Sequence, residues 1–186
     1  MHAALPPSDW LQRWAHLLPA GGRVLDVACG RGRHLRWLAG RGFVLTGIDR
    51  DAAALADLHD LASEVELVEA DIENQPWPMP GRLFDAVLVS NYLWRPLWPQ
   101  LLASLAPGGV LVYETFAAGN EAVGKPSRPD FLLQPGELLQ RCASLHTVAY
   151  EDGFLDAPPR FVQRVVARCP GALGARLKSP LRKESE

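Results

Sequence analysis

The sequence predicts a single α/β domain whose mostly parallel sheet is covered by helices on both faces. Short apolar segments alternate with amphipathic segments through the first two thirds of the chain. The apolar segments are hydrophobic at consecutive positions, as in strands that are buried on both faces of a parallel sheet. A length of 186 residues with 48% hydrophobic side chains is enough for one core of this kind.

The expected elements follow in a regular order. Ser8 is placed to cap a first amphipathic helix, and Pro135 falls near the first turn of the last one. Helices are expected over 8–18, 31–39, 51–61, 97–109 and 134–143. Strands are expected over 23–28, 43–49, 64–71, 84–91 and 110–116, with two antiparallel strands at 145–152 and 160–169. Residues 1–169 would form the domain, and the charged segment 170–186 would be a disordered tail.

Composition and charge argue against several function classes. The formal charge of -2 gives no general attraction to nucleic acids or anionic membranes. Cys29, Cys142 and Cys169 form neither a Cys-x-x-Cys pair nor a cluster at metal-ligand spacing, which predicts reduced thiols in the cytoplasm and no metal site. Neither a signal peptide nor an apolar run long enough to span a membrane is visible. We therefore expect a cytoplasmic protein without a membrane partner.

The segment 24–34, VLDVACGRGRH, predicts a buried strand that runs through a glycine loop into a helix. The dinucleotide pattern G-x-G-x-x-G is broken because Leu35 stands where the third glycine belongs, and a P-loop is excluded because no Gly-Lys-Ser/Thr follows. Asp26, on the strand before the loop, would repel a pyrophosphate. The loop therefore favours a ligand with a positively charged amino group.

Polar residues or glycines end four of the predicted strands. Gly30 and Gly32 follow the first strand, Asp49 the second, Asp71 the third and Asn91 the fourth. Ligands of open parallel sheets bind beyond the carboxyl ends of the strands, so these residues are expected to converge on one site. Taken singly, each aspartate has a structural alternative, as a buried carboxylate, a helix cap or a turn residue.

These residues resemble the first motif of class I S-adenosylmethionine-dependent methyltransferases, in which alternating small residues follow an acidic one, as in DVACGRG over 26–32. The resemblance covers residues 8–168 and is nearest to small bacterial methyltransferases of the tellurite-resistance type. It implies a Rossmann-like, doubly wound sheet of order 3-2-1-4-5-7-6, S-adenosylmethionine as the cofactor, and transfer of a methyl group by in-line displacement. Ala28 replaces the usual first glycine, a departure that the bulk of one methyl group should permit.

The resemblance also implies roles for individual residues. Asp26 would orient the cofactor's amino group, and Asp49 would accept two ribose hydroxyls. Asp71 would take the adenine amino group, with the Ile72 N–H near the ring, and Asn91 would lie under the methionine. The expected cofactor-binding residues are Asp26, Ala28, Gly30, Gly32, Asp49, Arg50, Asp71, Ile72, Asn91 and Arg13.

Arg13 belongs to this set because the first helix of the family often lies over the methionine end, where an arginine can pair with the carboxylate. Trp10 and Trp14 share its helical spacing, and packing of an amphipathic helix explains them as well.

The acceptor is expected to be a small molecule. The residues after the fourth strand depart from the Asn/Asp-Pro-Pro-aromatic motif of enzymes that methylate nucleic-acid amino groups. Tyr92 and Trp94 could face the sulfonium, where a ring stabilises positive charge. Tyr92 and Glu114 are the candidate catalytic residues, and Glu114 could bind an amine or act as a base.

The long loop over 117–130 leaves the fifth strand at the cofactor edge, where it is placed to act as a lid. Lys125 and Arg128 of this loop, together with Arg95, indicate an anionic group on the acceptor, although a solvated loop explains them too.

Two other functions stay open at this point. A degenerate domain could bind a nucleotide-like ligand without chemistry, although the complete set of Asp26, Gly30, Gly32, Asp49 and Asp71 argues against it. An NAD-dependent oxidoreductase is disfavoured by Leu35 and Asp26.

Overall fold

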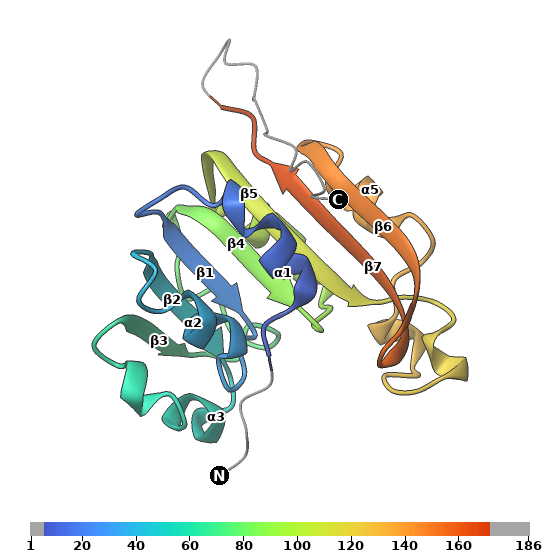
Figure 1. Cartoon of the computed structure of the whole chain (residues 1–186), viewed down its shortest axis with the longest axis horizontal. Helices are drawn as coiled ribbons and strands as arrows, with labels where there is room; N and C mark the ends of the chain where they lie inside the picture. Colours follow the sequence, from blue (N-terminus) through green and yellow to red (C-terminus); the bar gives the residue numbers. More distant parts are fainter. Residues whose placement is uncertain (1–5, 172–186) are drawn as a thin grey trace, which may run out of the picture.

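The computed structural model describes residues 6–171, so most of the segment expected to be a disordered tail lies outside the described residues. One seven-stranded sheet has the order β3-β2-β1-β4-β5-β7-β6, which confirms the predicted fold class and order (Figure 1). β1 to β5 are parallel, β7 pairs antiparallel with β5, and β6 pairs antiparallel with β7. The strands are β1 Arg23–Val27, β2 Val44–Asp49, β3 Val65–Glu69, β4 Phe84–Ser90, β5 Leu105–Phe116, β6 His146–Asp156 and β7 Pro159–Arg168.

The helices are short and cover both faces of the sheet. The α-helices are α1 Asp9–Trp14, α2 Arg33–Leu38, α3 Ala52–Ala56, α4 Trp98–Ala103 and α5 Glu137–Arg141. The 3-10 helices are η1 Ala15–Leu17, η2 His59–Leu61, η3 Arg95–Leu97, η4 Asn120–Ala122 and η5 Pro129–Phe131. α1, α2 and α3 pack on one face, and in the view of Figure 1 α1 and α2 lie in front of the sheet. α4 and α5 pack on the other face.

Two of the expected helices end early, each for a local reason. In the segment predicted as a helix over 51–61, Arg36 Nη2 donates to the Asp57 carbonyl at 2.6 Å, and Leu61 N turns to the Leu58 carbonyl at 2.9 Å. The helix therefore stops at Ala56 and continues as the tighter η2. The helix predicted over 97–109 ends at Ala103, because Leu105 pairs with Phe84 and the chain joins β5 directly.

Tight packing between β2 and α2 holds the glycine loop against the sheet. A Cβ at Gly47 would lie 2.6 Å from Leu35 Cδ1 and 3.0 Å from Cys29 Sγ, so a side chain at this position would collide with the helix. Leu35 stands where a dinucleotide-binding loop has its third glycine, and its side chain packs over Gly47 of β2. Among residues 6–171, no helix is long and apolar enough to cross a membrane.

Candidate functional site

The glycine loop between β1 and α2 has a left-handed backbone at alternate positions. Ala28, Gly30 and Gly32 have φ values of 53°, 54° and 66°. The Gly30 N–H donates to Asp49 Oδ2 at 2.7 Å, so the carboxylate at the end of β2 fixes the loop. A Cβ at Gly32 would lie 2.7 Å from two methyl groups of Leu58, so a side chain here would displace Leu58 and also strain the left-handed backbone.

A cavity of about 390 Å³ opens beside this loop, at the carboxyl ends of the parallel strands. Its size falls within the range of small-molecule sites. Seven of the residues predicted for the site line it: Ala28, Asp49, Arg50, Asp71, Ile72, Asn91 and Tyr92. The structure therefore brings together residues from the ends of β1, β2, β3 and β4, as the sheet-edge argument predicted.

Asp49 and Asp51 have separate roles, although either could have capped the helix. Asp51 is the N-cap of α3, and its side chain accepts from the Ala53 and Ala54 N–H groups. Asp49 Oδ1 accepts from the Asp51 N–H at 2.9 Å. Asp49 thus lines the cavity as a carboxylate held by two backbone N–H groups.

Asp71 is oriented by its own turn at the end of β3. Its pKa lies below the ordinary value, chiefly because the Asn74 side chain donates to it and the Glu73 N–H adds a second hydrogen bond. The carboxylate is therefore ionised at neutral pH, in the state that accepts hydrogen bonds from a ligand amino group.

Tyr92 presents a protonated phenol to the cavity. Its hydroxyl donates to Glu73 Oε1 at 3.3 Å. Burial raises the pKa of Tyr92, and the neighbouring Glu73 raises it further. The Tyr92 carbonyl accepts from the Tyr113 hydroxyl at 2.8 Å, and Tyr113 stacks on Trp98 with ring centroids 4.9 Å apart. Hydrogen bonding and ring stacking therefore support this wall of the site.

Asp26 is buried below the glycine loop and does not line the cavity. Only 1% of its surface is exposed. Its Oδ2 atom lies 3.4 Å from His34 Nδ1 without the alignment of a hydrogen bond, and no other group within residues 6–171 satisfies it. A buried carboxylate oxygen without a hydrogen bond is costly, and the structure does not bring this atom into the lining of the cavity, where a ligand would meet it.

Three further candidates lie outside the lining of the cavity. Arg13 Nη1 pairs with Glu151 Oε1 at 3.0 Å, and its guanidinium lies over Trp10 and Trp14, which form part of the core. Trp94 packs against the core beneath α4 and α5. Glu114 is 7% exposed and accepts from Ser90 Oγ at 3.1 Å.

Of the three cations expected to face an anionic acceptor, two form ion pairs with carboxylates of the protein and the third is exposed. Arg95 binds Glu137 with two nitrogen atoms, and Arg128 pairs with Asp130 at 3.1 Å. Lys125 is exposed, and its neighbour Pro126 lines the cavity. None of the three cations is itself a lining residue of the described cavity.

Several lining residues were missed by sequence reasoning. Thr115 and Phe116 end β5, so the rule that placed Asn91 at the end of β4 would also have found them. Pro126 and Phe131 belong to the segment after β5, where nothing in the local sequence shows which side chains turn inward. The remaining missed residues are Ala70, Glu73 and Leu93.

Comparison with known proteins agrees with this geometry. Residues 24–109 match the family model described as a methyltransferase domain. This segment of the chain is therefore similar to a methyltransferase domain. This match confirms the predicted relationship and covers the glycine loop, Asp49, Asp71 and the cavity wall at Asn91 and Tyr92.

Two relatives are trans-aconitate 2-methyltransferases. The protein from Paracidovorax citrulli is 39% identical over 105 residues, which cover 52% of this chain and 40% of that protein. The protein from Escherichia fergusonii is 32% identical over 143 residues, which cover 72% of this chain and 47% of that protein. This chain thus spans less than half the length of these curated relatives.

Solved structures share the fold at low sequence identity. TehB from Haemophilus influenzae has a TM-score of 0.70 at 18% identity, over 87% of this chain and 61% of that one. An S-adenosylmethionine-dependent methyltransferase from Mesorhizobium loti has a TM-score of 0.66 at 20% identity, over 83% of this chain and 95% of that one. The chain therefore has the Rossmann-like fold predicted for it.

Proposed function

We propose that this chain binds S-adenosylmethionine and transfers its methyl group to a small-molecule acceptor. The observation that carries the proposal is the cavity at the carboxyl ends of β1 to β5, lined by Asp49 and Asp71 and placed beside the glycine loop. When bound, S-adenosylmethionine supplies a methyl group on a sulfonium. The carboxylates of Asp49 and Asp71, at the ends of β2 and β3, suit a cofactor with ribose hydroxyls and an adenine amino group.

We infer a role for each side of the cavity. Asp49 would accept the ribose hydroxyls, Asp71 the adenine amino group, and Asn91 would lie under the methionine. Tyr92, Leu93, Thr115, Phe116, Pro126 and Phe131 would form the acceptor side. This side positions the nucleophile and excludes water, which are the main demands of an in-line displacement.

No general base is assigned to this reaction. Tyr92 keeps its proton because its pKa is raised, and Glu114 lies outside the lining of the cavity. An acceptor that is nucleophilic at neutral pH, such as a thiol or a carboxylate, fits this arrangement best. A carboxylate acceptor would also agree with the relatives, which are trans-aconitate 2-methyltransferases.

An anionic acceptor is the finer part of the proposal. Of the three cations expected to recognise it, Lys125 is the one for which the structure gives no ion pair, whereas Arg95 and Arg128 bind carboxylates of the protein. We place the reaction in the cytoplasm, in keeping with the free thiols of Cys29, Cys142 and Cys169.

The test is release of S-adenosylhomocysteine from S-adenosylmethionine with trans-aconitate, a neutral aromatic thiol or no acceptor. Release that depends on either acceptor supports methyl transfer, and a preference for trans-aconitate supports the anionic acceptor. Binding of the cofactor without transfer to any acceptor would favour the ligand-binding alternative. Binding of NADH in its place would favour an oxidoreductase.

A further inference from the structure

The segment 117–133, here called the flap, connects β5 to the last helix and forms part of the cavity wall. Pro126 and Phe131 of the flap line the cavity, yet nearly all of its residues from 121 to 131 are exposed. Leu132 and Leu133 are buried and hold the C-terminal end of the flap, whereas the exposed part from 121 to 131 depends more on specific hydrogen bonds.

Two of these attachments lie at the base and inside the flap. Ala117 and Leu133 form an isolated parallel bridge that closes the base. Asn120, which is 1% exposed, donates to the Pro126 carbonyl at 2.9 Å and accepts from the Phe161 N–H of β7 at 3.2 Å. These contacts fix the N-terminal half of the flap, but they do not reach Phe131.

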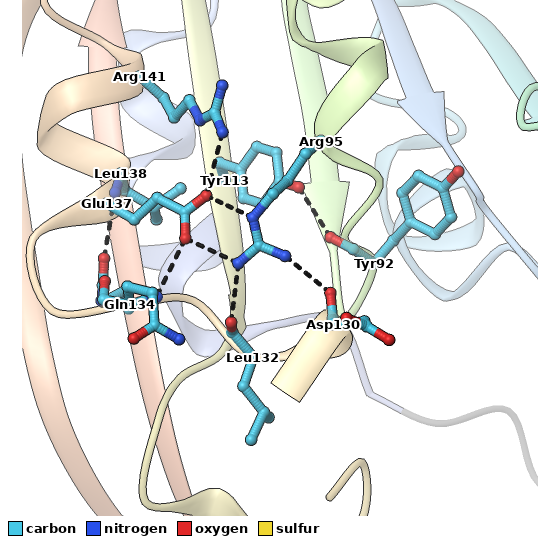
Figure 2. A network of polar contacts seen from close by, with 10 residues as sticks. Tyr92, Arg95, Tyr113, Asp130, Leu132, Gln134, Glu137, Leu138 and Arg141 are labelled. Atoms are coloured by element: carbon cyan, nitrogen blue, oxygen red, sulfur yellow. Dashed lines mark hydrogen bonds and ion pairs between the residues drawn. The ribbon is translucent and has the colours of Figure 1, made fainter. Parts of the chain in front are cut away.

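The third attachment is Arg95, which comes shortly after Tyr92 in the sequence (Figure 2). Tyr92 itself lines the cavity. Arg95 Nη1 donates to the Asp130 carbonyl at 2.8 Å, and Nη2 donates to the Leu132 carbonyl at 2.9 Å. These carbonyls belong to the residues on either side of Phe131. One guanidinium therefore fixes the backbone on both sides of the aromatic residue that lines the cavity.

Glu137 holds this guanidinium in place from α5. Arg95 Nε and Nη2 each donate to a different oxygen of its carboxylate at 2.8 Å, in a bidentate pair (Figure 2). Glu137 is 7% exposed, and it also accepts from the Gln134 N–H at 3.0 Å. A planar guanidinium can serve a carboxylate and two carbonyls together, whereas the ammonium of lysine cannot reproduce this geometry.

We propose that Arg95, held by Glu137, is a positioning residue that sets the flap and with it Phe131 against the acceptor side of the cavity. The inference rests on the proposed function, because that function identifies this side of the cavity as the one that holds the acceptor. Arg95 was expected from the sequence to bind the acceptor's anionic group. In this proposal it instead shapes the acceptor side of the cavity by holding the backbone of the flap.

The test is hydrogen–deuterium exchange of the full chain, read by mass spectrometry for peptides within 118–133. The variants are Arg95→Gln and Arg95→Lys, with Arg141→Gln as the matched control. Arg141 contacts the same Glu137 carboxylate at 3.4 Å, but the structure gives it no contact with the flap. Loss of charge-assisted hydrogen bonds should speed flap exchange about 10- to 100-fold in both Arg95 variants and leave it unchanged in the control.

Two further readouts separate positioning from general loss of structure. Exchange in β1 to β4 should stay as in the wild type, and the Kd for S-adenosylhomocysteine should change by less than about threefold. Unchanged flap exchange in the Arg95 variants, equal acceleration in Arg141→Gln, or acceleration spread over the whole sheet would overturn the proposal. If Arg95→Gln does not fold, Arg95→Lys is judged by the same criteria. Failure of the wild type to bind S-adenosylhomocysteine would refute the proposed function, while the exchange result would still decide the role of Arg95.

Discussion

At the scale of single residues, the glycine loop has the same left-handed backbone at an alanine and at a glycine. Ala28 has a φ of 53° and Gly30 a φ of 54°, and a Cβ at Gly30 would meet no atom within 4 Å. The two positions therefore differ in side chain but not in backbone demand. The alanine carries a conformational cost that the glycine avoids.

This difference predicts opposite effects for two exchanges. Ala28→Gly should raise the free energy of unfolding by about 0.5–1 kcal/mol, since relief of the left-handed strain exceeds the added chain entropy of glycine. Gly30→Ala should lower it by a similar amount. Urea unfolding of both variants without cofactor measures the effects, and a change of the same sign in both would contradict this account.

At the residue scale, the sequence could predict which residues lie near the candidate site. It could not predict which partners each side chain contacts. Asp49, Asp71 and Asn91 were predicted to lie at the candidate site because each ends or follows a strand, and all three line the cavity. Arg95 was expected in the site because it is a cation in the right segment. Its carboxylate partner stands 42 positions further along the chain, so the local sequence could not show that the charge was already engaged.

At the scale of elements, short helices depend on their caps. α3 has five residues, and the Asp51 side chain satisfies two of its first N–H groups. Asp51→Ala should cost about 1 kcal/mol of stability, as loss of an N-cap generally does. Because Asp51 does not line the cavity, S-adenosylhomocysteine affinity should be retained. Chemical denaturation and calorimetry of the variant test both halves of this prediction, and lost affinity would show that the cap also shapes the site.

The Arg95–Glu137 pair makes part of the stability depend on pH. Burial alone would raise the pKa of Glu137, but hydrogen bonds from Arg95 and Gln134 and the charge of Arg95 hold it below the ordinary value of 4.5. A carboxylate whose folded pKa is lowered stabilises the fold above its unfolded pKa, and this contribution is lost as pH falls through the folded value.

The stability difference between the wild type and Glu137→Gln should therefore be greatest near neutral pH and shrink below pH 4.5. Urea titrations across this range measure the difference. A gap that stays constant down to strongly acidic pH would show that the carboxylate charge contributes nothing to holding α5 against η3.

The order and type of the elements followed from their patterns, but several boundaries did not. Consecutive apolar positions identified β1, β4 and β5, because burial on both faces leaves no alternation, whereas alternating side chains identified β3. The break after Ala56 depends on Arg36 of α2 binding the Asp57 carbonyl, a contact between two elements that helix propensity cannot report. Similarly, the early start of β5 at Leu105 depends on its pairing with Phe84.

At the scale of the whole molecule, ligand binding should be coupled to global stability. S-adenosylhomocysteine at 100 times its Kd should add about 2.7 kcal/mol to the free energy of unfolding. For a chain of this size the midpoint of thermal unfolding should rise by about 5–10 °C. Thermal unfolding with S-adenosylhomocysteine and with NADH measures the effect, and a rise produced by NADH alone would point to a different cofactor.

We infer that the cavity beside the glycine loop binds the cofactor through Asp49. The most direct test of this inference is calorimetric titration with S-adenosylhomocysteine of the wild type, Asp49→Ala and the matched variant Asp51→Ala. We expect binding by the wild type and Asp51→Ala, and a loss of about 100-fold in Asp49→Ala, as for hydrogen bonds to a charged group. Equal affinity in all three proteins, or no binding by the wild type, would contradict the account.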